Sequence, residues 1–447
     1  MLETATLGLF ILGLIACVGF GLSIFYALFF GLALFYAYGF IKKYSFRQMM
    51  KMTLSGMKTV LSVTIVFILI GGLTAIWRAS GTIPYIIYYA SKVILPQTFV
   101  LASFILCCCI SMLMGTSFGT AATMGVICMM MGRTMGISPV WTGGAVLAGA
   151  FFGDRNSPMS TSALLVSELT GTNIFANVRL MIRSAIVPFL LTCLIYLVIG
   201  FTMKTGASSS DAAALFAKHF NLLWVTVIPA ALIVVLSAFR VSVKITVVVS
   251  VVCGGIICMA VQGLDFLQTL KILALGYSAP DAKLGAMLNG GGIISMLKPA
   301  AIVLLSSSYS GIFEGTGLLS GIKKYIGLIA EKINPFGAYI LTAVFTAMIS
   351  CNQTLAIMLT HQLCGDTVAS NDDQALSLEN SAVIISPLIP WCIAGAVPLA
   401  AIDAPTSSIF CACYLFLVPI CYYITKRRGQ RMKPASGPHA EMKTRSA

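Results

Sequence analysis

Two stretches, GTSFGTAATMGV (residues 115–126) and GAFFGDRNSPMSTSA (residues 149–163), decide how this chain folds. They place Asp154, Arg155 and several hydroxyl side chains between segments that are otherwise apolar. An acidic side chain at the centre of a bilayer costs about 3 kcal/mol or more, so it is rarely there by accident. The glycine and the proline that flank it are expected to open the helix, which is tolerated only where protein or a water-filled cavity satisfies the backbone. We therefore expect one half of an ion or substrate site in a transporter.

The composition is that of a polytopic membrane protein. Of the 447 residues, 58% are hydrophobic and 9% are charged, whereas soluble proteins average about 25% charged residues. Apolar runs of the length that a spanning helix requires recur along the whole chain. We expect an all-α membrane protein with roughly 10–12 transmembrane segments, so the lipid bilayer is its first partner.

The net charge of +14 is concentrated at two places. Five basic residues lie between Lys42 and Lys58, and five more lie between Lys426 and Lys433. Short basic flanks beside membrane spans mark the cytoplasmic side. We therefore predict a multi-pass protein of the cell (inner) membrane with both termini in the cytoplasm, and the charge does not indicate a nucleic-acid partner.

The apolar segments predict a hairpin, a surface helix and several broken helices. Residues 6–40 are too long for one crossing and are expected to form two helices that turn near Phe20. Residues 43–60 alternate basic and apolar positions at helical spacing, which is typical of a helix lying on the membrane surface. Further apolar segments cover residues 83–94, 97–114, 120–132, 139–152 and 176–202. Several of them are too short to span alone, as expected for helices interrupted near the midplane.

The chain is predicted to contain two membrane repeats of opposite orientation. Residues 1–202 would form the first repeat, 203–219 a linker, 220–425 the second repeat and 426–447 a basic cytoplasmic tail. In the second half a basic turn at Arg240 lies between the first two helices, whereas in the first half the basic segment follows them. By the positive-inside rule the two halves are inverted, with their broken helices meeting at the midplane.

Three short similarities in the same order support this repeat. The paired segments are LTAIWRASGTI (73–83) with SGIFEGTGLL (310–319), MGTSFGT (114–120) with SCNQTLA (350–356), and GDRNSP (153–158) with ENSAVIISPLIP (379–390). The first pair aligns Arg78 with Glu314, which are also candidates for an ion pair with each other.

Asp154 is the leading candidate for a cation ligand or a proton carrier. The hydroxyls of Ser157 and Ser160 would complete an oxygen shell of the kind that hard cations such as Na⁺ prefer. The alternative is a buried ion pair between Asp154 and an arginine that only holds helices together.

Other polar residues of the two halves are candidates for the same site. Small-residue helix packing is the alternative for the hydroxyls near residue 116, and Glu379 is alternatively a surface charge at the start of a helix. The candidates for cation or substrate binding are Asp154, Ser157, Thr116, Ser117, Asn352, Gln353, Thr354, Glu379 and Ser386, and those for charge tuning or anion binding are Arg155, Arg78 and Glu314.

Five motifs carry a resemblance to a known family. They are GTSFGTAATMGV, GAFFGDRNSPMS, GIFEGTGLL, NQTLAIML and LENSAVIISPLIPW. Together they resemble the NhaC-type sodium/proton antiporter family, which belongs to the ion transporter superfamily of inverted-repeat carriers. The resemblance covers most of the chain and implies electrochemical exchange of Na⁺ for H⁺. Some members that are similar in sequence exchange organic anions such as malate and lactate.

The sequence departs from the family pattern at two acidic positions. The family usually reads GDxxSPLSDT, and Thr161 stands where its second Asp is expected. It often reads LEDS near the second breaker, where Asn380 replaces the Asp. Fewer fixed negative charges weaken cation binding and leave Arg155 less neutralised. Both departures favour a substrate that carries its own carboxylate.

The leading hypothesis is a secondary transporter that exchanges cytoplasmic Na⁺ for external H⁺, with Asp154 holding either ion. The alternative within the same class is Na⁺- or H⁺-coupled exchange of an organic anion or amino acid, with Arg155 binding its carboxylate. A passive channel would need a continuous ring of polar groups along a pore, and paired broken helices argue against it. No nucleophile with an adjacent base and no metal-ligand spacing indicates an enzyme. No cofactor is expected beyond the transported ions, and a homodimer is one option for the oligomeric state.

Overall fold

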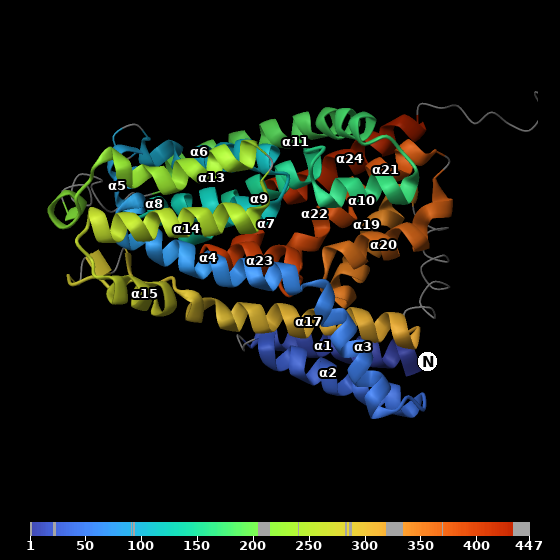
Figure 1. Ribbon diagram of the computed structural model, residues 1–447. Coiled ribbons are helices and arrows are strands. Elements are labelled where there is room, and N and C mark those ends of the chain that lie inside the picture. The colour runs from blue at the N-terminus through green and yellow to red at the C-terminus, as the bar shows by residue number, and fades with distance from the viewer. Residues whose placement is uncertain are drawn as a thin grey trace, which may run out of the picture.

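The computed structural model describes residues 2–20, 24–90, 92, 94–203, 215–239, 241–281, 284–285, 288–318, 334–368 and 370–431. Every named element in these ranges is a helix, and Figure 1 shows most helix axes aligned along one direction of the molecule. The predicted all-α class is therefore confirmed. The greater part of the predicted linker, Arg240 and most of the predicted basic tail lie outside the described residues.

Several described segments are long and apolar enough to cross a membrane. Four are single stretches: Pro96–Met114, Ile174–Thr202, Val243–Ala260 and Ile293–Phe313. Two bent pairs raise the number to six, namely Thr64–Ala79 with Thr82–Ala90 at 65° and Asn371–Leu388 with Ile393–Ala401 at 54°. The multi-pass architecture and the presence of broken helices are thus confirmed. The larger number of roughly 10–12 crossings stays a prediction.

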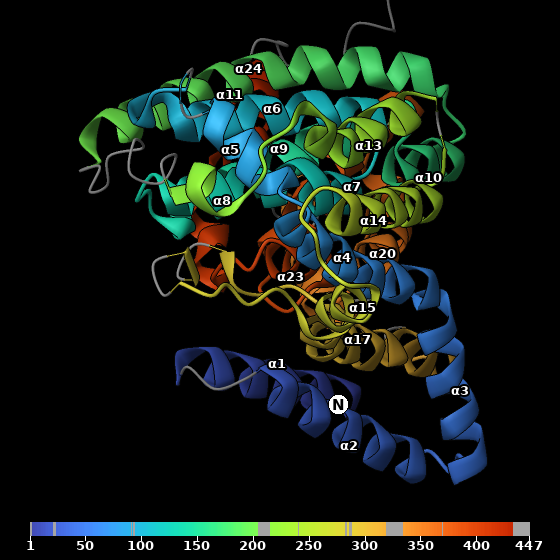
Figure 2. The same cartoon turned by 60° about the vertical axis from the view of Figure 1, so that its left-hand side comes forward.

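The N-terminal segment forms the predicted hairpin, followed by a helix where a membrane-surface helix is predicted. Helices α1 (Leu2–Gly19) and α2 (Ile24–Ile41) are antiparallel neighbours, and they pack on α17 (Leu297–Thr316) through edge-to-face aromatic contacts such as Phe10 with Tyr309. Figure 2 shows α1 and α2 beneath α17 and α3 (Phe46–Thr59) rising beside them.

In the first half, two helices end at a sharp change of direction. Helix α4 (Leu61–Ala79) meets α5 (Thr82–Ala90) at Gly81, whose φ of +80° is a left-handed conformation that glycine adopts without strain. Helix α6 (Phe99–Met114) ends at Gly115 with φ +64°. The chain then continues through α7 (Ser117–Thr120) and the π-helical turn η2 (Ala121–Gly125) into α8 (Val126–Thr134).

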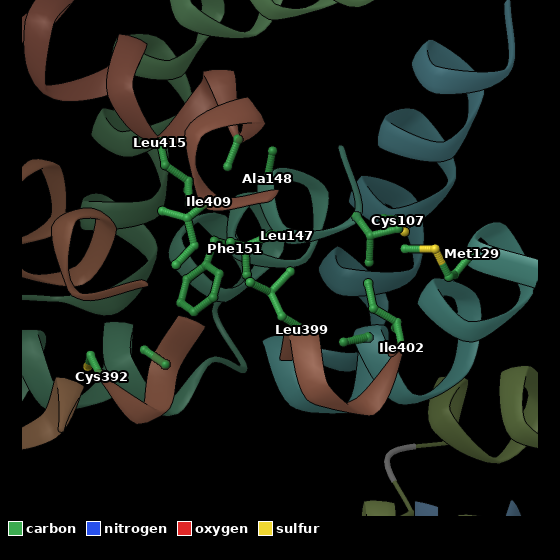
Figure 3. Close-up of a cluster of buried hydrophobic side chains, with 14 of the residues drawn as sticks. Cys107, Met129, Leu147, Ala148, Phe151, Cys392, Leu399, Ile402, Ile409 and Leu415 are labelled. Carbon is green, nitrogen blue, oxygen red and sulfur yellow. The ribbon is translucent and has the colours of Figure 1, made fainter. Parts of the chain in front are cut away.

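Helix α9 (Pro139–Asn156) is the centre of the core. Leu147, Ala148 and Phe151 are fully buried, and Figure 3 shows them among side chains of α6, α8, η8 (Thr406–Cys411), α23 (Ile393–Ala401) and α24 (Cys413–Arg431). Glycines let α6 approach closely, because a Cβ added at Gly153 would lie 2.2 Å from the carbonyl carbon of Ser111.

This packing corrects the expected place of the break in α9. Gly153 does not open the helix: α9 runs through Asp154 and Arg155 to Asn156, and the backbone becomes extended only at Ser157 (φ −90°, ψ 134°). The residue before a proline disfavours the α conformation, so the helix ends directly before Pro158. Two helices follow, α10 (Thr161–Thr170) and α11 (Ile174–Thr202).

The second half has a similar series of helices. It comprises η3 (Trp224–Val227), α13 (Ile228–Ala238), α14 (Val243–Ala260), α15 (Phe266–Leu275), η4 (Ile293–Met296), α17, α19 (Pro335–Ser350), α20 (Gln353–Cys364), η6 (Gly365–Thr367), α21 (Asn371–Asn380), α22 (Ala382–Ile385), η7 (Ser386–Leu388), α23, η8 and α24. Helix α21 continues through α22 and η7 to Leu388 before the chain bends into α23.

The helix breaks occur at the same spacing in the two halves. Helices α6, α17 and α19 end at the left-handed Gly115, Gly317 and Cys351, and the left-handed Gly81 lies two residues after the end of α4. In each half 34 residues separate the two left-handed positions. The next residue is also alike, since Thr116 (φ −146°, ψ 126°) and Asn352 (φ −141°, ψ 130°) are both extended. The similar sequence segments therefore coincide with similar backbone breaks.

Candidate functional site

The polar cluster lies where helix ends from the two halves meet. In the first half the α6–α7 break contacts the α9–α10 break, with Gly115 against Met159. The hydroxyl of Ser157 donates to the carbonyl of Met112 at 3.0 Å. This contact satisfies one of the carbonyls that the end of α6 leaves without a partner in the helix.

The second half closes its own breaks in the same manner. The backbone N–H of Ile393 donates to the carbonyl of Cys351 at 2.9 Å, and the indole N–H of Trp391 donates to the carbonyl of Met348 at 2.9 Å. Met348 precedes its left-handed residue by three positions, as Met112 does in the first half. In each half, a hydrogen bond to the carbonyl three residues before the left-handed position (Met112 or Met348) therefore joins the two helix breaks.

Asp154 lies in a shell of neutral oxygen donors and acceptors. Its side chain is 3% exposed, and its Oδ1 accepts a hydrogen bond from Ser160 Oγ at 3.0 Å. Ser162 Oγ lies 2.8 Å from Ser160 Oγ and donates to the carbonyl of Asp154 at 3.0 Å. The side chains of Ser117 and Gln353 also interact with the carboxyl group. Its other oxygen, Oδ2, is buried and has no hydrogen-bond partner among the described residues.

The same serines begin α10. Ser160 Oγ accepts from the backbone N–H groups of Ser162 and Ala163, so it is the N-cap of this helix. One side chain therefore holds both the Asp154 carboxyl and the start of the helix that follows the break. A hard cation prefers oxygen ligands of this kind, namely one carboxylate together with hydroxyl and amide oxygens. A proton on that carboxylate would compete with the cation for the same site.

Arg155 is fully buried and makes its hydrogen bonds to neutral groups. Its Nη2 donates to Asn380 Oδ1 at 2.6 Å and to Ser184 Oγ at 2.7 Å. Its Nη1 donates to Asn156 Oδ1 at 2.7 Å and, at longer distance, to the carbonyl of Met181. Asn380 thus gives this guanidinium a neutral amide acceptor, and the predicted effect of the replaced acid on cation binding stays a prediction.

No ion pair between described residues supports the alternative in which Asp154 only holds helices together through an arginine. The salt bridges between described residues are Lys42–Glu3, Arg133–Asp403 and Lys426–Asp373, and none of them includes Asp154 or Arg155.

Glu379 is the second acid of the cluster. It lies in the last turn of α21, is fully buried, and neither carboxyl oxygen has a hydrogen-bond partner among the described residues. Its charged neighbours are Arg155, which attracts it, and Asp154, which repels it. The alternative that placed Glu379 at the surface is therefore wrong. Burial without a hydrogen bond is costly for a carboxylate, so its ionised form depends on the guanidinium.

Other predicted residues shape the breaks instead of facing Asp154. Asn352 Oδ1 caps α20 by accepting from the N–H of Thr354 at 2.9 Å, and the Thr354 side chain is exposed. Ser386 Oγ donates to the carbonyl of Ala382 within its own helix. Gln353 joins the site to α22, since its Nε2 donates to the carbonyl of Val383 at 3.0 Å.

Arg78 and Glu314 lie apart from this cluster and from each other. The guanidinium of Arg78 is buried beside Met130. It also lies close to the backbone of Gly290, because a Cβ added at Gly290 would be 2.7 Å from Arg78 Nη1. Glu314 belongs to the last turns of α17, where Gly315 accepts a bond from Tyr44, and its side chain lies outside the described part of the chain. The two backbones lie towards opposite ends of α17, but the predicted ion pair of Arg78 with Glu314 rests on a side chain outside the described residues and stays a prediction.

A cavity of about 430 Å³ adjoins the α7 break. Thr116 lines it with residues of α4, α14 and α23, among them Phe67, Val243 and Val397. Thr116 Oγ1 also caps α7 by accepting from the N–H of Gly119. The helix start that carries Ser117 towards Asp154 is therefore reached from a space between the two halves.

Sequence reasoning missed several partners of the site. Ser162 could have been found from the S-T-S series after the proline, which is typical of a helix N-terminus. Ser184 and Tyr414, which contact Arg155 from α11 and α24, carry no local signal because long-range packing brings them to the site.

Comparison with known proteins identifies the family. The sequence profile described as the Na⁺/H⁺ antiporter family matches residues 3–168 and 149–425. The chain belongs to this family. It is therefore a secondary antiporter of the NhaC-like group and a multi-pass membrane protein, and not an enzyme.

Relatives within the family carry different cargoes. The chain is 29% identical over 381 residues to the malate-2H⁺/Na⁺-lactate antiporter of Bacillus subtilis, covering 82% of this chain and 80% of the relative. It is 27% identical over 361 residues to the Na⁺/H⁺ antiporter NhaC of Alkalihalophilus pseudofirmus, covering 77% and 76%. It is 26% identical over 357 residues to the arginine/ornithine antiporter ArcD of Halobacterium salinarum, covering 75% and 72%.

Proposed function

We propose that this protein is a Na⁺/H⁺ antiporter that exchanges cytoplasmic Na⁺ for external H⁺, and that Asp154 is the group that the two ions occupy in turn. The observation that carries the proposal is the environment of this carboxylate. It is buried among neutral oxygens, it forms no ion pair with a described residue, and one of its oxygens has no hydrogen-bond partner among them.

Binding of Na⁺ and H⁺ at one carboxylate makes the two mutually exclusive. In the Na⁺ form the ionised Asp154 would supply the charge, and Ser117, Gln353, Ser160 and Ser162 would supply neutral oxygens. In the H⁺ form the proton would sit on Oδ2, which has no described partner, while Oδ1 keeps its bond from Ser160. Thr116 and Asn352 would hold the starts of the helices that bring Ser117 and Gln353 to the site.

Arg155 would favour the ionised form of Glu379 without a hydrogen bond to it. When both acids are ionised, Asp154 and Glu379 would carry two negative charges, and Arg155 would offset one of them. A site of low dielectric constant disfavours net charge. The remaining negative charge is then balanced by one exchangeable cation, either Na⁺ or a proton.

Alternating access would come from rocking of two inverted repeats, residues 1–202 and 220–425. The equal spacing of the left-handed residues supports the repeat, and the cavity that Thr116 lines offers a route to the site. Both termini would be cytoplasmic, and the linker near Ser209 would be external. In a cysteine-free protein, a cysteine at position 209 should react only with an external maleimide. Labelling only from the cytoplasm would contradict the inverted arrangement.

Exchange of an organic anion or amino acid is the second candidate. Asn380 gives Arg155 a neutral partner where the family often has an acid, which leaves its charge available to a carboxylate. The malate/lactate and arginine/ornithine relatives show that the family includes such carriers. In that case Arg155→Gln should abolish transport of the organic anion.

Transport by the purified protein in proteoliposomes separates the two candidates. A Na⁺ gradient alone should drive H⁺ movement, and an imposed pH gradient alone should drive uptake of radioactive Na⁺. If either flux appears only when malate, lactate or arginine is added, the second candidate is correct. Absence of H⁺ movement under every Na⁺ gradient, with organic cargo still exchanged, would reject Na⁺/H⁺ exchange.

A further inference from the structure

Helix α3 presents one packed face and one open face. Its packed face includes Met49 and Thr53, which are buried, and Thr53 Oγ1 lies 2.9 Å from the hydroxyl of Tyr36. It crosses α17 at close range, because a Cβ at Gly56 would lie 2.4 Å from the carbonyl oxygen of Ser307. In Figure 2 this helix rises beside the bundle, from the end of α2 to the start of α4.

The start of α3 is rigidly defined. Ser45 and Gln48 form a capping box, in which Ser45 Oγ accepts from the N–H of Gln48 and Gln48 Oε1 accepts from the N–H of Ser45 at 2.8 Å. The orientation of the open face is thus set by both the cap and the glycine crossing.

The open face combines an apolar row with a basic row. Phe46, Met50 and Leu54 recur every four residues and are 60%, 37% and 50% exposed. Arg47 and Lys51 are exposed beside them at the same spacing. Together with Lys58, Leu61 and Leu304 of α17, these side chains line a groove of about 790 Å³.

The charged residues that line the groove are all basic. The sequence contains no Asp or Glu between Glu3 and Asp154, and the salt bridges between described residues do not include Arg47, Lys51 or Lys58. An interfacial helix with this composition buries its apolar row among acyl chains and leaves its basic row at the level of the phosphates.

We propose that the open face of α3 is a binding surface for an anionic phospholipid, whose acyl chain lies along Phe46, Met50 and Leu54 and whose phosphate contacts Arg47, Lys51 and Lys58. Charge complementarity selects this partner over a neutral lipid, because each basic side chain near an anionic headgroup strengthens binding roughly fivefold. Because α3 packs closely on α17 at Gly56, a lipid bound to the open face of α3 would stabilise the helix that joins the N-terminal hairpin to the transport bundle.

Native mass spectrometry of the purified protein tests the proposal with phosphatidylglycerol and phosphatidylcholine as probes. The wild type should retain phosphatidylglycerol in preference to phosphatidylcholine. The triple variant Arg47→Gln, Lys51→Gln, Lys58→Gln should lose that preference, with at least a tenfold decrease in affinity. The matched control Lys218→Gln, Lys271→Gln, Lys298→Gln removes the same charge from exposed positions elsewhere, and it should bind phosphatidylglycerol as the wild type does.

A substitution in the apolar row tests the acyl-chain contact separately from the charge. Leu54→Ser leaves the charge unchanged and should shorten lipid retention while the protein stays monodisperse. Equal phosphatidylglycerol binding by the wild type and the triple variant would overturn the proposal. The proposal would also be overturned if the wild type were a dimer and the triple variant a monomer with unchanged lipid binding, because the surface would then be a dimer interface.

Discussion

Replacing Asn380 by Asp tests whether Arg155 controls the cation site. Asn380 Oδ1 accepts from Arg155 Nη2 at 2.6 Å, and its Nδ2 is buried without a hydrogen-bond partner among the described residues. The variant keeps the shape of the side chain, turns a neutral acceptor into a charged one and removes an unsatisfied donor. It also restores the acid that the family often has at this position.

Two magnitudes follow from this contact. A hydrogen bond to a charged group contributes about 1.5–3 kcal/mol against about 1 kcal/mol for a neutral one, and an unsatisfied buried donor costs about 1–3 kcal/mol. Desolvation of the new carboxylate offsets part of this gain, so we expect Asn380→Asp to stabilise the protein by about 1–2 kcal/mol. A unit charge added within roughly 10 Å of a bound cation is worth about 1.5 kcal/mol at an effective dielectric constant near 20. The KM for Na⁺ should therefore fall about tenfold.

The assay is the Na⁺ dependence of Na⁺-driven H⁺ release from proteoliposomes, together with the thermal unfolding midpoint. Asn371→Asp is the matched control, because it adds the same charge to the exposed first residue of α21. It should leave the KM for Na⁺ unchanged. If Asn380→Asp raises the unfolding midpoint but leaves that KM unaltered, Arg155 stabilises the fold and its charge does not act on the cation.

Three further substitutions give distinct outcomes. Thr161→Asp adds a carboxylate at the exposed first residue of α10, so it should lower the KM for Na⁺ severalfold; inhibition of transport would instead indicate a substrate with a carboxylate. Ser160→Ala removes the bond to Asp154 and the α10 cap, so it should destabilise the protein by about 1–3 kcal/mol in thermal unfolding and raise the KM for Na⁺. Gly153→Ala should lower the free energy of unfolding by about 1–3 kcal/mol, because the added Cβ would overlap α6. In the control Gly8→Ala the added Cβ meets no atom within 4 Å, so the variant should unfold as the wild type does. Equal unfolding midpoints for the two variants would contradict the close packing at Gly153.

The fold was predictable where a single physical signal was strong. The length of the apolar run before Lys42 gave the α1–α2 hairpin, and the spacing of basic and apolar residues gave α3. The predicted break in α9 was misplaced because a glycine such as Gly153 can have either of two structural roles. A glycine permits a turn, but it also permits two helices to touch, and only the contact with Ser111 shows that packing is its role here.

The site was predictable in its charged residues and less so in its neutral ones. Asp154, Arg155 and Glu379 are conspicuous because ionisable side chains are rare in apolar segments, and all three belong to one cluster. Hydroxyl and amide side chains also cap helices and bond to their own backbone, as Asn352 and Ser386 do. Which of these roles applies depends on contacts between distant segments, and sequence spacing does not contain that information.

The most direct measurement of the central claim is Na⁺-driven H⁺ flux through Asp154→Asn in proteoliposomes, with the wild type reconstituted at the same protein content. The substitution keeps the bond that Ser160 can donate to the retained oxygen and removes the charge for which Na⁺ and H⁺ would compete. We predict a monodisperse protein with a wild-type unfolding midpoint within a few degrees and no coupled flux above empty liposomes. Wild-type flux from this folded variant would show that Asp154 is structural and would contradict the account.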